Sequence, residues 1–247
     1  LTTQLDDSNI FTNASTCCDL TVSYDNAANR WVLSVLSKPG AGNTFDGLQI
    51  AVSDGPNPLT AGWNSYQFNM DTDYQKLSVW SDGYYLAANK QGAEAVHALE
   101  RDVMLAGGPA PQIIGFPLAG AVAGGGFFAP QAFNVTDANL PAPGGATFVY
   151  LQDDAYVGVA SDHLKLWTVD VNWVTPGNST VTTQPQIPLT PFISVFDGGA
   201  FAALTQPGGI DIDALQAIIM NQAQFRKFPG HNSAVFNFVV DTDATAG

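Results

Sequence analysis

The stretch DYQKLSVWSDGYYLAAN, residues 73–89, decides the expected fold of this chain. It contains two short runs rich in apolar and aromatic residues, 76–80 and 84–89, on either side of Ser81-Asp82-Gly83. Runs of this kind favour β-strands, and a short turn that ends in glycine favours a hairpin between them. The stretch therefore predicts two antiparallel strands joined by a tight turn.

Similar runs recur along the chain in groups of four, separated by Gly, Pro and Asn. The first group covers 20–24, 30–37, 48–53 and 65–69, and the second covers 76–80, 84–89, 93–99 and 112–118. The third covers 131–135, 147–152, 163–172 and 180–189, and an incomplete fourth covers 215–220, 224–228 and 233–240. Four strands per unit of roughly 50–60 residues are typical of β-propeller blades.

Two segments have the composition of helices, AEAVHALERDVMLAGG at 93–108 and DIDALQAIIMNQAQFRKF at 211–228. Intrinsic propensity favours a helix in both. The four-strand repeat requires strands at 93–99 and 217–228, and tertiary context can override propensity. We therefore predict strands there, with only a short helical turn over 101–106 that ends at Gly107.

The composition argues against two classes of partner. Hydrophobic residues make up 46% of the 247 residues, which is enough for a large core. Eight Lys and Arg residues stand against 22 acids, so the formal charge of −14 opposes binding to nucleic acid or anionic lipid. Twenty of the acids are Asp, which prefers turns, and no run of 18 apolar residues occurs. We expect an acidic protein of strands and turns with no nucleic-acid partner and no membrane span.

Cysteine usage and sequons bear on location. Cys17 and Cys18 are the only cysteines, and a bridge between neighbours closes a strained ring, so they are either reduced or separately paired thiols or a vicinal disulfide. Glycosylation candidates are Asn13, Asn134 and Asn178, all in turn-rich stretches. The sequence begins without Met or a signal-peptide pattern, as expected of a processed chain or a segment of a longer one. We expect a secreted, extracellular or cell-surface protein.

An ordered set of motifs carries a family resemblance. It comprises VSYDNAANRWVLSVLS, DYQKLSVWSDGYYLAAN, RDVMLAGGPA, DHLKLWTVDVNWVTPGNST and DALQAIIMNQAQFRKFPGHNSAVFNFVVD. In this order the motifs resemble a family of large secreted β-propeller proteins, widespread in bacteria and mostly uncharacterised. The chain departs from the family pattern at Cys17-Cys18-Asp19-Leu20, where Gly-Asp-Pro is expected and only Asp19 matches.

The resemblance and the repeat together imply an all-β β-propeller built of four-stranded antiparallel blades. The chain supplies about three and a half to four of them, with units at about 18–70, 71–120, 127–190 and 210–247. We expect 1–247 to be one propeller domain or the interior portion of one. Another chain or segment would then complete the ring.

Residues that could carry chemistry gather at the predicted blade junction. The ligand-binding candidates there are Asp73, Tyr74, Lys76 and Trp80. Paired acids recur at Asp71/Asp73, Asp153/Asp154, Asp211/Asp213 and Asp241/Asp243. Such pairs suit turn caps, calcium sites completed by carbonyl oxygens, or the two carboxylates of a glycan-cleaving site. The metal candidates are Asp71, Asp73, Asp153 and Asp154, with Ca²⁺ as the expected ion.

The sequence lacks the short signatures of common enzymes. It has no G-x-S-x-G, H-E-x-x-H, Walker loop or strand-linked G-x-G-x-x-G. The three histidines, His97, His163 and His231, share no spacing and are expected to be structural. We therefore expect a secreted, non-enzymatic recognition, adhesion or scaffold propeller that binds a glycan or an extracellular protein. The alternative is an extracellular polysaccharide-active lyase or hydrolase with its site in the central channel.

Overall fold

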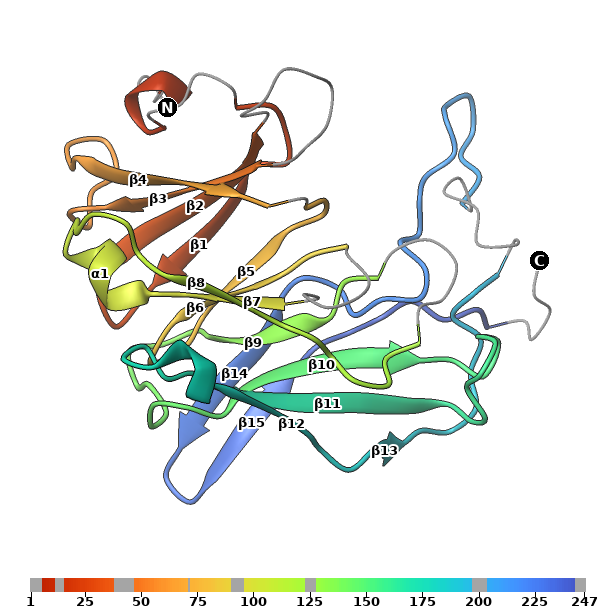
Figure 1. The fold of residues 1–247 in the computed structure, drawn as a ribbon. Coiled ribbons are helices and arrows are strands. Elements are labelled where there is room, and N and C mark those ends of the chain that lie inside the picture. Colours follow the sequence, from red (N-terminus) through yellow and green to blue (C-terminus); the bar gives the residue numbers. More distant parts are fainter. Residues whose placement is uncertain are drawn as a thin grey trace.

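The computed structural model describes residues 6–11, 16–37, 47–70, 72–89, 96–122, 128–196 and 204–242. Its described part is all-β, with three successive four-stranded antiparallel groups (Figure 1). The first sheet contains β1 (Thr21–Asp25), β2 (Arg30–Ser37), β3 (Gly47–Ser53) and β4 (Trp63–Asn69) in that order. The second contains β5 (Lys76–Val79), β6 (Tyr84–Ala87), β7 (Val96–Leu99) and β8 (Ile113–Phe116) in that order.

The third sheet is larger and curls as it extends (Figure 1). Its four-stranded part contains β9 (Gln131–Val135), β10 (Ala146–Gln152), β11 (His163–Asp170) and β12 (Thr180–Thr183). The short β13 (Ile187–Pro188) also pairs with β11, and β14 (Ala223–Phe228) forms a hairpin with β15 (His231–Val235). β14 pairs with β9 in parallel. The hairpin of the fourth predicted unit, residues 210–247, therefore extends the third sheet and does not form a separate sheet.

The short helices lie at connections between strands. The only α-helix in the described part is α1 (Arg101–Leu105), and the 3-10 turns are η1 (Asp7–Asn9) and η2 (Pro176–Asn178). Gly107 follows α1 with φ of 65°, as expected of a residue that ends a helix. The prediction of a strand before a short helical turn is therefore confirmed in this segment. Among the described residues, no helix has the length and apolar character needed to cross a bilayer.

The predicted strand at 215–220 is not observed. Leu215 and Ala217 have φ of 48° and 68°, which is incompatible with an extended strand. Ile218 and Ile219 are nevertheless fully buried. Their segment is held by hydrogen bonds from the Ala217 amide to the Ser194 carbonyl and from the Met220 amide to the Asn237 carbonyl. The apolar run is thus an irregular buried segment, and the regular strand begins at Ala223.

The first strands of the three groups recur at a fixed interval and pack side by side. β1, β5 and β9 begin at Thr21, Lys76 and Gln131, which is one start every 55 residues. Ser23 Oγ donates to the Leu77 carbonyl oxygen at 3.2 Å, and Ser78 Oγ donates to the Ala132 carbonyl oxygen at 3.0 Å. In both bonds the partners lie 54 residues apart in sequence. An equivalent serine hydrogen bond therefore joins β1 to β5 and β5 to β9.

The core lies on both faces of the middle sheet. Tyr84 and Leu86 pack on the side of the first sheet, where Leu48 and Ile50 lie. The residues of β6 that alternate with them, Tyr85 and Ala87, point to the other side. There they pack against Phe148 and Trp167 of the third sheet. Because neighbouring residues in a strand point to opposite faces, a strand covered on both sides must be apolar throughout. This explains why β6 reads Tyr-Tyr-Leu-Ala.

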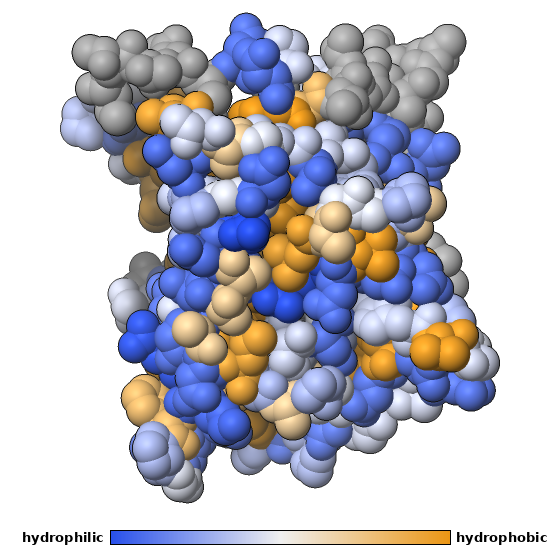
Figure 2. Space-filling view, turned by 90° about the vertical axis from the view of Figure 1, so that its left-hand side faces the viewer, coloured by the Kyte–Doolittle hydropathy of each residue, from blue (hydrophilic) through white to orange (hydrophobic). Residues whose placement is uncertain are grey.

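The outer surface is mixed in character. On the face that Figure 2 shows, hydrophobic residues lie in patches bordered by hydrophilic residues. Two apolar side chains are exposed at β1: Leu20, directly before the strand, is 55% exposed, and Val22, within it, is 54% exposed. Apolar surface is therefore exposed at β1, the end strand of the first sheet, although its Ser23 side packs on β5.

Candidate functional site

The residues predicted at the blade junction meet where β5 begins. Lys76 extends over the ring of Tyr74, with its Nζ 3.6 Å from the ring centroid. Tyr74 adopts φ of 53°, which turns the chain just before the strand. An ammonium at this distance from an aromatic face is attracted by the ring quadrupole. The structure thus brings together two of the predicted ligand-binding residues, Tyr74 and Lys76.

Three carboxylates act electrostatically on this pair. Burial lowers the pKa of Lys76, while the negative charges of Asp19 and Asp73 oppose that shift. Burial also raises the pKa of Tyr74, and the charge of Asp213 raises it further. We call these five residues, Asp19, Asp73, Tyr74, Lys76 and Asp213, the junction cluster. Tyr74, Lys76 and Asp213 are partly buried, whereas Asp19 and Asp73 are exposed. The cluster combines one ammonium, one neutral phenol and three acids, so it offers both hydrogen-bond donors and acceptors.

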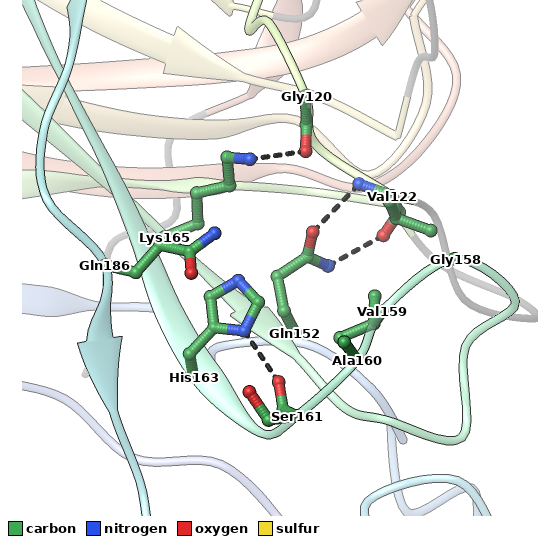
Figure 3. A pocket seen from close by; sticks show the side chains of 10 residues that line it. All are labelled: Gly120, Val122, Gln152, Gly158, Val159, Ala160, Ser161, His163, Lys165 and Gln186. Carbon is green, nitrogen blue, oxygen red and sulfur yellow. Dashed lines mark hydrogen bonds between the residues drawn. The ribbon is translucent and has the colours of Figure 1, made fainter.

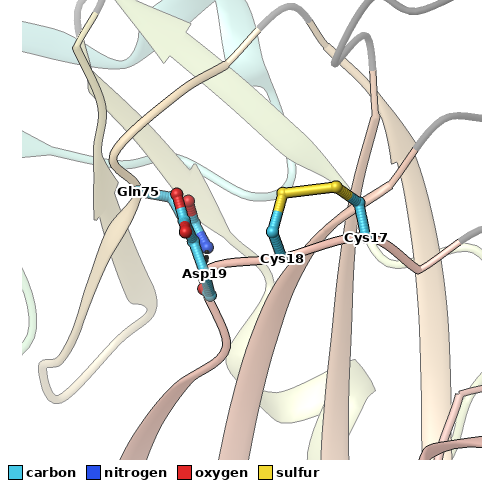
Figure 4. Close-up of a disulfide and its surroundings, with 4 residues drawn as sticks. All are labelled: Cys17, Cys18, Asp19 and Gln75. Carbon is cyan, nitrogen blue, oxygen red and sulfur yellow. Dashed lines mark hydrogen bonds between the residues drawn. A yellow bond between two sulfur atoms is a disulfide. The ribbon is translucent and has the colours of Figure 1, made fainter.

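A disulfide flanks the junction cluster (Figure 4). Cys17 and Cys18 are bonded to each other in the segment that leads into β1. The segment is anchored to β2, because the Cys17 amide donates to the Leu36 carbonyl and the Leu36 amide donates to the Cys18 carbonyl. Next to it, the buried Gln75 donates from Nε2 to the Asp19 carbonyl oxygen at 2.5 Å. This contact ties the start of β1 to the start of β5 and positions Asp19 in the cluster.

Trp80 is not part of the junction cluster. It follows the other end of β5, is 4% exposed and packs in the core beside Phe225. Its indole nitrogen donates to the Gly144 carbonyl oxygen at 2.9 Å. Its side chain therefore fills the space between the second and third sheets. Asp71, the other predicted residue of this stretch, lies outside the described residues.

No family model matches this chain. No curated protein and no solved structure is significantly similar to it. The resemblance to secreted propeller proteins therefore stays a prediction drawn from the sequence motifs.

A second acidic group lies at the turn between β10 and β11. Asp153, Asp154 and Asp162 each offer a carboxylate oxygen, and these oxygens lie within 4.8 Å of one another. Two of these residues form a predicted pair, whereas Asp162 is isolated in sequence and was not predicted. The three acids could hold a metal ion.

The hydrogen bonds of these acids fix the positions of the carboxylates that could bind a metal ion. Asp153 accepts from the Ser194 amide at 2.6 Å and from the Ser194 hydroxyl at 2.8 Å, and Asp162 accepts from the amides of Asp154 and Phe192. These bonds pin the turn to the segment near Ser194 and hold two buried carboxylates in place. Asp154 is exposed. Oxygen ligands of this kind suit Ca²⁺, which would neutralise part of their mutual repulsion.

The sequons fall in different environments. Asn134 lies within β9, where its Oδ1 accepts from the Val79 amide at 2.8 Å and its Nδ2 donates to Gln222 at 3.1 Å. Because its side chain is 5% exposed, it is not the accessible turn residue that a glycan acceptor requires. Asn178 is exposed at the end of η2, as expected, and Asn13 lies outside the described residues.

The histidines lie apart from the junction cluster. His97 is buried in β7, His163 is the first residue of β11, and His231 stacks on Phe228 in the hairpin. Two members of the cluster are not evident as site residues from the sequence: Asp213 stands there only in an acidic pair, and Asp19 matches only the family pattern. The spacing of Asp213 from Tyr74 carries no signal, because only the fold brings the loop before β14 to the start of β5.

Proposed function

We propose that this chain is part of a secreted β-propeller and acts as a non-enzymatic recognition or scaffold module. The ligand is a glycan or an extracellular protein, and it binds at the junction cluster. One observation carries the proposal: Lys76, Tyr74 and three acids converge at the start of the first strands, without a histidine among them.

The propeller assignment is supported by the repeated geometry of the sheets. Three four-stranded meanders follow one another, and their first strands are joined by equivalent bonds from Ser23 and Ser78. Radial repetition of such sheets is the principle of a propeller. Because Ser23 points toward β5, the exposed Val22 beside it points to the opposite face of the first sheet, on which a further blade, from another chain or segment, would pack.

The binding assignment is supported by the chemistry of the junction cluster. Because the pKa of Tyr74 is raised above its ordinary value of 10.0, its phenol is neutral at physiological pH. The phenol can therefore both donate and accept hydrogen bonds, as can the hydroxyl groups of a glycan. Lys76 adds a charged donor and the acids add acceptors. A surface with both hydrogen-bond donors and acceptors suits a glycan, which carries many hydroxyl groups, or a polar protein surface.

A binding screen with matched variants tests this proposal. Fluorescently labelled protein is applied to arrays of extracellular glycans and matrix proteins, and each hit is titrated with the Lys76→Met and Lys227→Met variants. Lys227 is an exposed lysine on β14, so its variant carries the same loss of charge away from the junction cluster. We expect Lys76→Met to weaken binding at least tenfold and Lys227→Met to leave it unchanged. Equal binding by all three proteins would show that the ligand binds elsewhere.

The enzyme alternative has one supporting observation. Burial lowers the pKa of Lys76 beside Tyr74, which eases proton transfer at this position. A polysaccharide lyase or hydrolase would then release short products from an acidic or neutral polysaccharide, and Lys76→Met would abolish the release. Binding without product formation on the same polysaccharide supports the recognition module.

Calcium binding at Asp153, Asp154 and Asp162 forms part of the proposal. Adding 5 mM CaCl₂ to EDTA-treated protein is expected to raise the thermal unfolding midpoint, because a ligand that binds only the folded state stabilises it. Asp154→Asn removes the exposed carboxylate without disturbing the buried bonds, so it is expected to reduce the rise. Asp211→Asn, at another exposed acid, serves as the matched control. An unchanged midpoint in wild-type protein would rule out a stabilising calcium site.

A further inference from the structure

A small polar pocket lies at the end of the third sheet where β10 finishes and β11 begins (Figure 3). Its volume is about 200 Å³. The polar groups around it come from Gln152 on β10, from His163 and Lys165 on β11, and from Gln186 just before β13. The segment around Gly120 closes one side (Figure 3). This volume is smaller than that of the pockets that bind drug-sized molecules, so it has room for one small ligand, and the polar lining favours a polar one.

Lys165 supplies a positive charge to this pocket. Its Nζ donates to the Gly120 carbonyl oxygen at 2.6 Å, which uses one of its three donors. Its side chain is half-buried, and it forms no ion pair with any residue in the described part of the chain. Its Nζ also lies 6.0 Å from the centroid of the Trp167 ring. Both contacts are with neutral groups, so no described carboxylate compensates the charge of the ammonium. The pocket thus presents a cation that an anionic ligand would pair with.

His163 supplies an acceptor. Its Nδ1 lies 2.7 Å from the Ser161 carbonyl oxygen, and since a carbonyl only accepts, the proton resides on Nδ1. In the neutral ring this leaves Nε2 as an acceptor, and Figure 3 shows this nitrogen on the side of Gln186 and Lys165. The ring is 8% exposed and its orientation is fixed. A hydroxyl group of a ligand can therefore donate to Nε2.

Gln152 and Gln186 have different roles. Gln152 is buried and accepts from the Val122 amide at 2.9 Å, while its Nε2 donates back to the Val122 carbonyl at 2.8 Å. It therefore forms a rigid wall. Gln186 is exposed at the rim, with its amide directed toward the space above His163 (Figure 3). An amide in this position can both donate to and accept from a hydroxylated ligand.

The charges of the pocket select the class of ligand. No carboxylate is among the described residues that line it, although the chain carries 22 acids and a formal charge of −14. The neighbouring Asp162 accepts from the amides of Asp154 and Phe192 and is not among the lining residues. One ammonium with neutral donors and acceptors matches a single negative charge and adjacent hydroxyl groups. We propose that this pocket binds a small hydroxylated carboxylate of the uronic acid type.

Titration with matched sugars tests the proposal without any variant. Isothermal titration calorimetry or chemical-shift perturbation of ¹⁵N-labelled protein would compare D-glucuronate with D-glucose, which lacks the carboxylate. We expect saturable binding of D-glucuronate and at least tenfold weaker binding of D-glucose. Inorganic phosphate, a dianion near neutral pH, is expected to bind more weakly than D-glucuronate. No binding of D-glucuronate, equal binding of both sugars, or tighter binding of phosphate would overturn the proposal.

Variants then locate the site. Lys165→Met is expected to weaken D-glucuronate binding at least tenfold, and His163→Phe to weaken it several-fold, while Lys165→Arg retains most of it. Lys76→Met, in the junction cluster, should leave this binding unchanged, which separates this pocket from the site of the proposed function. Circular dichroism and the thermal midpoint establish that each variant is folded. Wild-type affinity in folded Lys165→Met would overturn the assignment.

Discussion

Asp25, at the end of β1, is fully buried, and its carboxylate joins separate parts of the fold. It accepts from Arg101 at two positions, Nε at 2.7 Å and Nη2 at 3.1 Å, and from the Tyr84 hydroxyl at 3.1 Å. These partners come from α1 and from β6 in the second sheet. A buried carboxylate of this kind is tolerated only because its charge is paired and its hydrogen bonds are made.

Removing the cation of this pair is expected to destabilise the protein strongly. Arg101→Met leaves Asp25 buried without its counter-charge, and breaking a buried pair on one side costs about 3–5 kcal/mol. Urea denaturation at neutral pH measures the loss. Arg226→Met is the matched control, because Arg226 is exposed and lies 4.0 Å from Asp137, where the expected loss is below about 1 kcal/mol. Similar losses in the two variants would contradict the assigned role of Asp25.

Asp82 makes stability depend on pH. Burial raises the pKa of its carboxyl above 3.8, although hydrogen bonds from the Gly144 amide and the Tyr85 hydroxyl oppose part of that shift. The folded state therefore holds this proton more tightly than the unfolded chain does. The stability that results is complete below pH 3.8 and is lost as pH rises through the folded pKa.

The Asp82→Asn variant tests this dependence. Because asparagine does not titrate, the wild-type protein should lose stability relative to the variant as pH rises from about 3.5 to 7. Urea denaturation of both proteins at several pH values gives the difference in free energy of unfolding. A difference that is constant over this range would show that Asp82 has the same pKa in the folded and unfolded states.

Among the secondary-structure elements, the contacts between first strands decide how the sheets are assembled. Ser78→Ala removes the bond to the Ala132 carbonyl between β5 and β9, and a lost hydrogen bond of this kind costs about 0.5–1.5 kcal/mol. Ser23→Ala should cost a similar amount, and the double variant should show the sum, since the two bonds join different strand pairs. Ser161→Ala, at an exposed turn, should change stability by less than about 0.5 kcal/mol. If urea denaturation gives the same change in free energy of unfolding for Ser78→Ala as for this control, the bond does not contribute to stability.

The local pattern of apolar and polar residues predicts a strand well where the environment of each face is the same along the whole strand. Strands β2 and β9 begin and end as the sequence indicates, and the short helix after β7 was also predicted. The pattern failed at 215–220, where buried Ile218 and Ile219 resemble a strand in composition. Their conformation is set by long-range bonds, such as the one that Tyr156 donates to the Ala217 carbonyl. Composition carries no information about such partners.

For the whole molecule, the excess of acids has a consequence for stability. A formal charge of −14 on 247 residues produces self-repulsion that disfavours the compact state. The Debye length falls from about 30 Å at 0.01 M salt to about 8 Å at 0.15 M. We expect the free energy of unfolding in urea to increase when NaCl is raised over this range. A decrease would indicate that attractive charge pairs outweigh the repulsion.

The candidate sites exist only in the folded molecule. The junction cluster joins Asp19, residues 73–76 and Asp213, which come from three distant parts of the chain. The polar pocket at the start of β11 likewise depends on the segment at Gly120 reaching Lys165. Asp73, Tyr74 and Lys76 could be selected from sequence because they are close together in it. Their partners could not, since no local spacing encodes which loop packs beside them.

The all-β class, the three groups of four strands and the acidic character can be predicted from the amino-acid sequence alone. These follow from side-chain polarity and backbone preference, which act over a few residues. Three features emerge only in the folded chain: the burial of Trp80 and Asn134, the parallel pairing of β14 with β9, and the choice of charges that face one another. Burial and electrostatic contact depend on distances between residues far apart in the chain, and packing sets those distances.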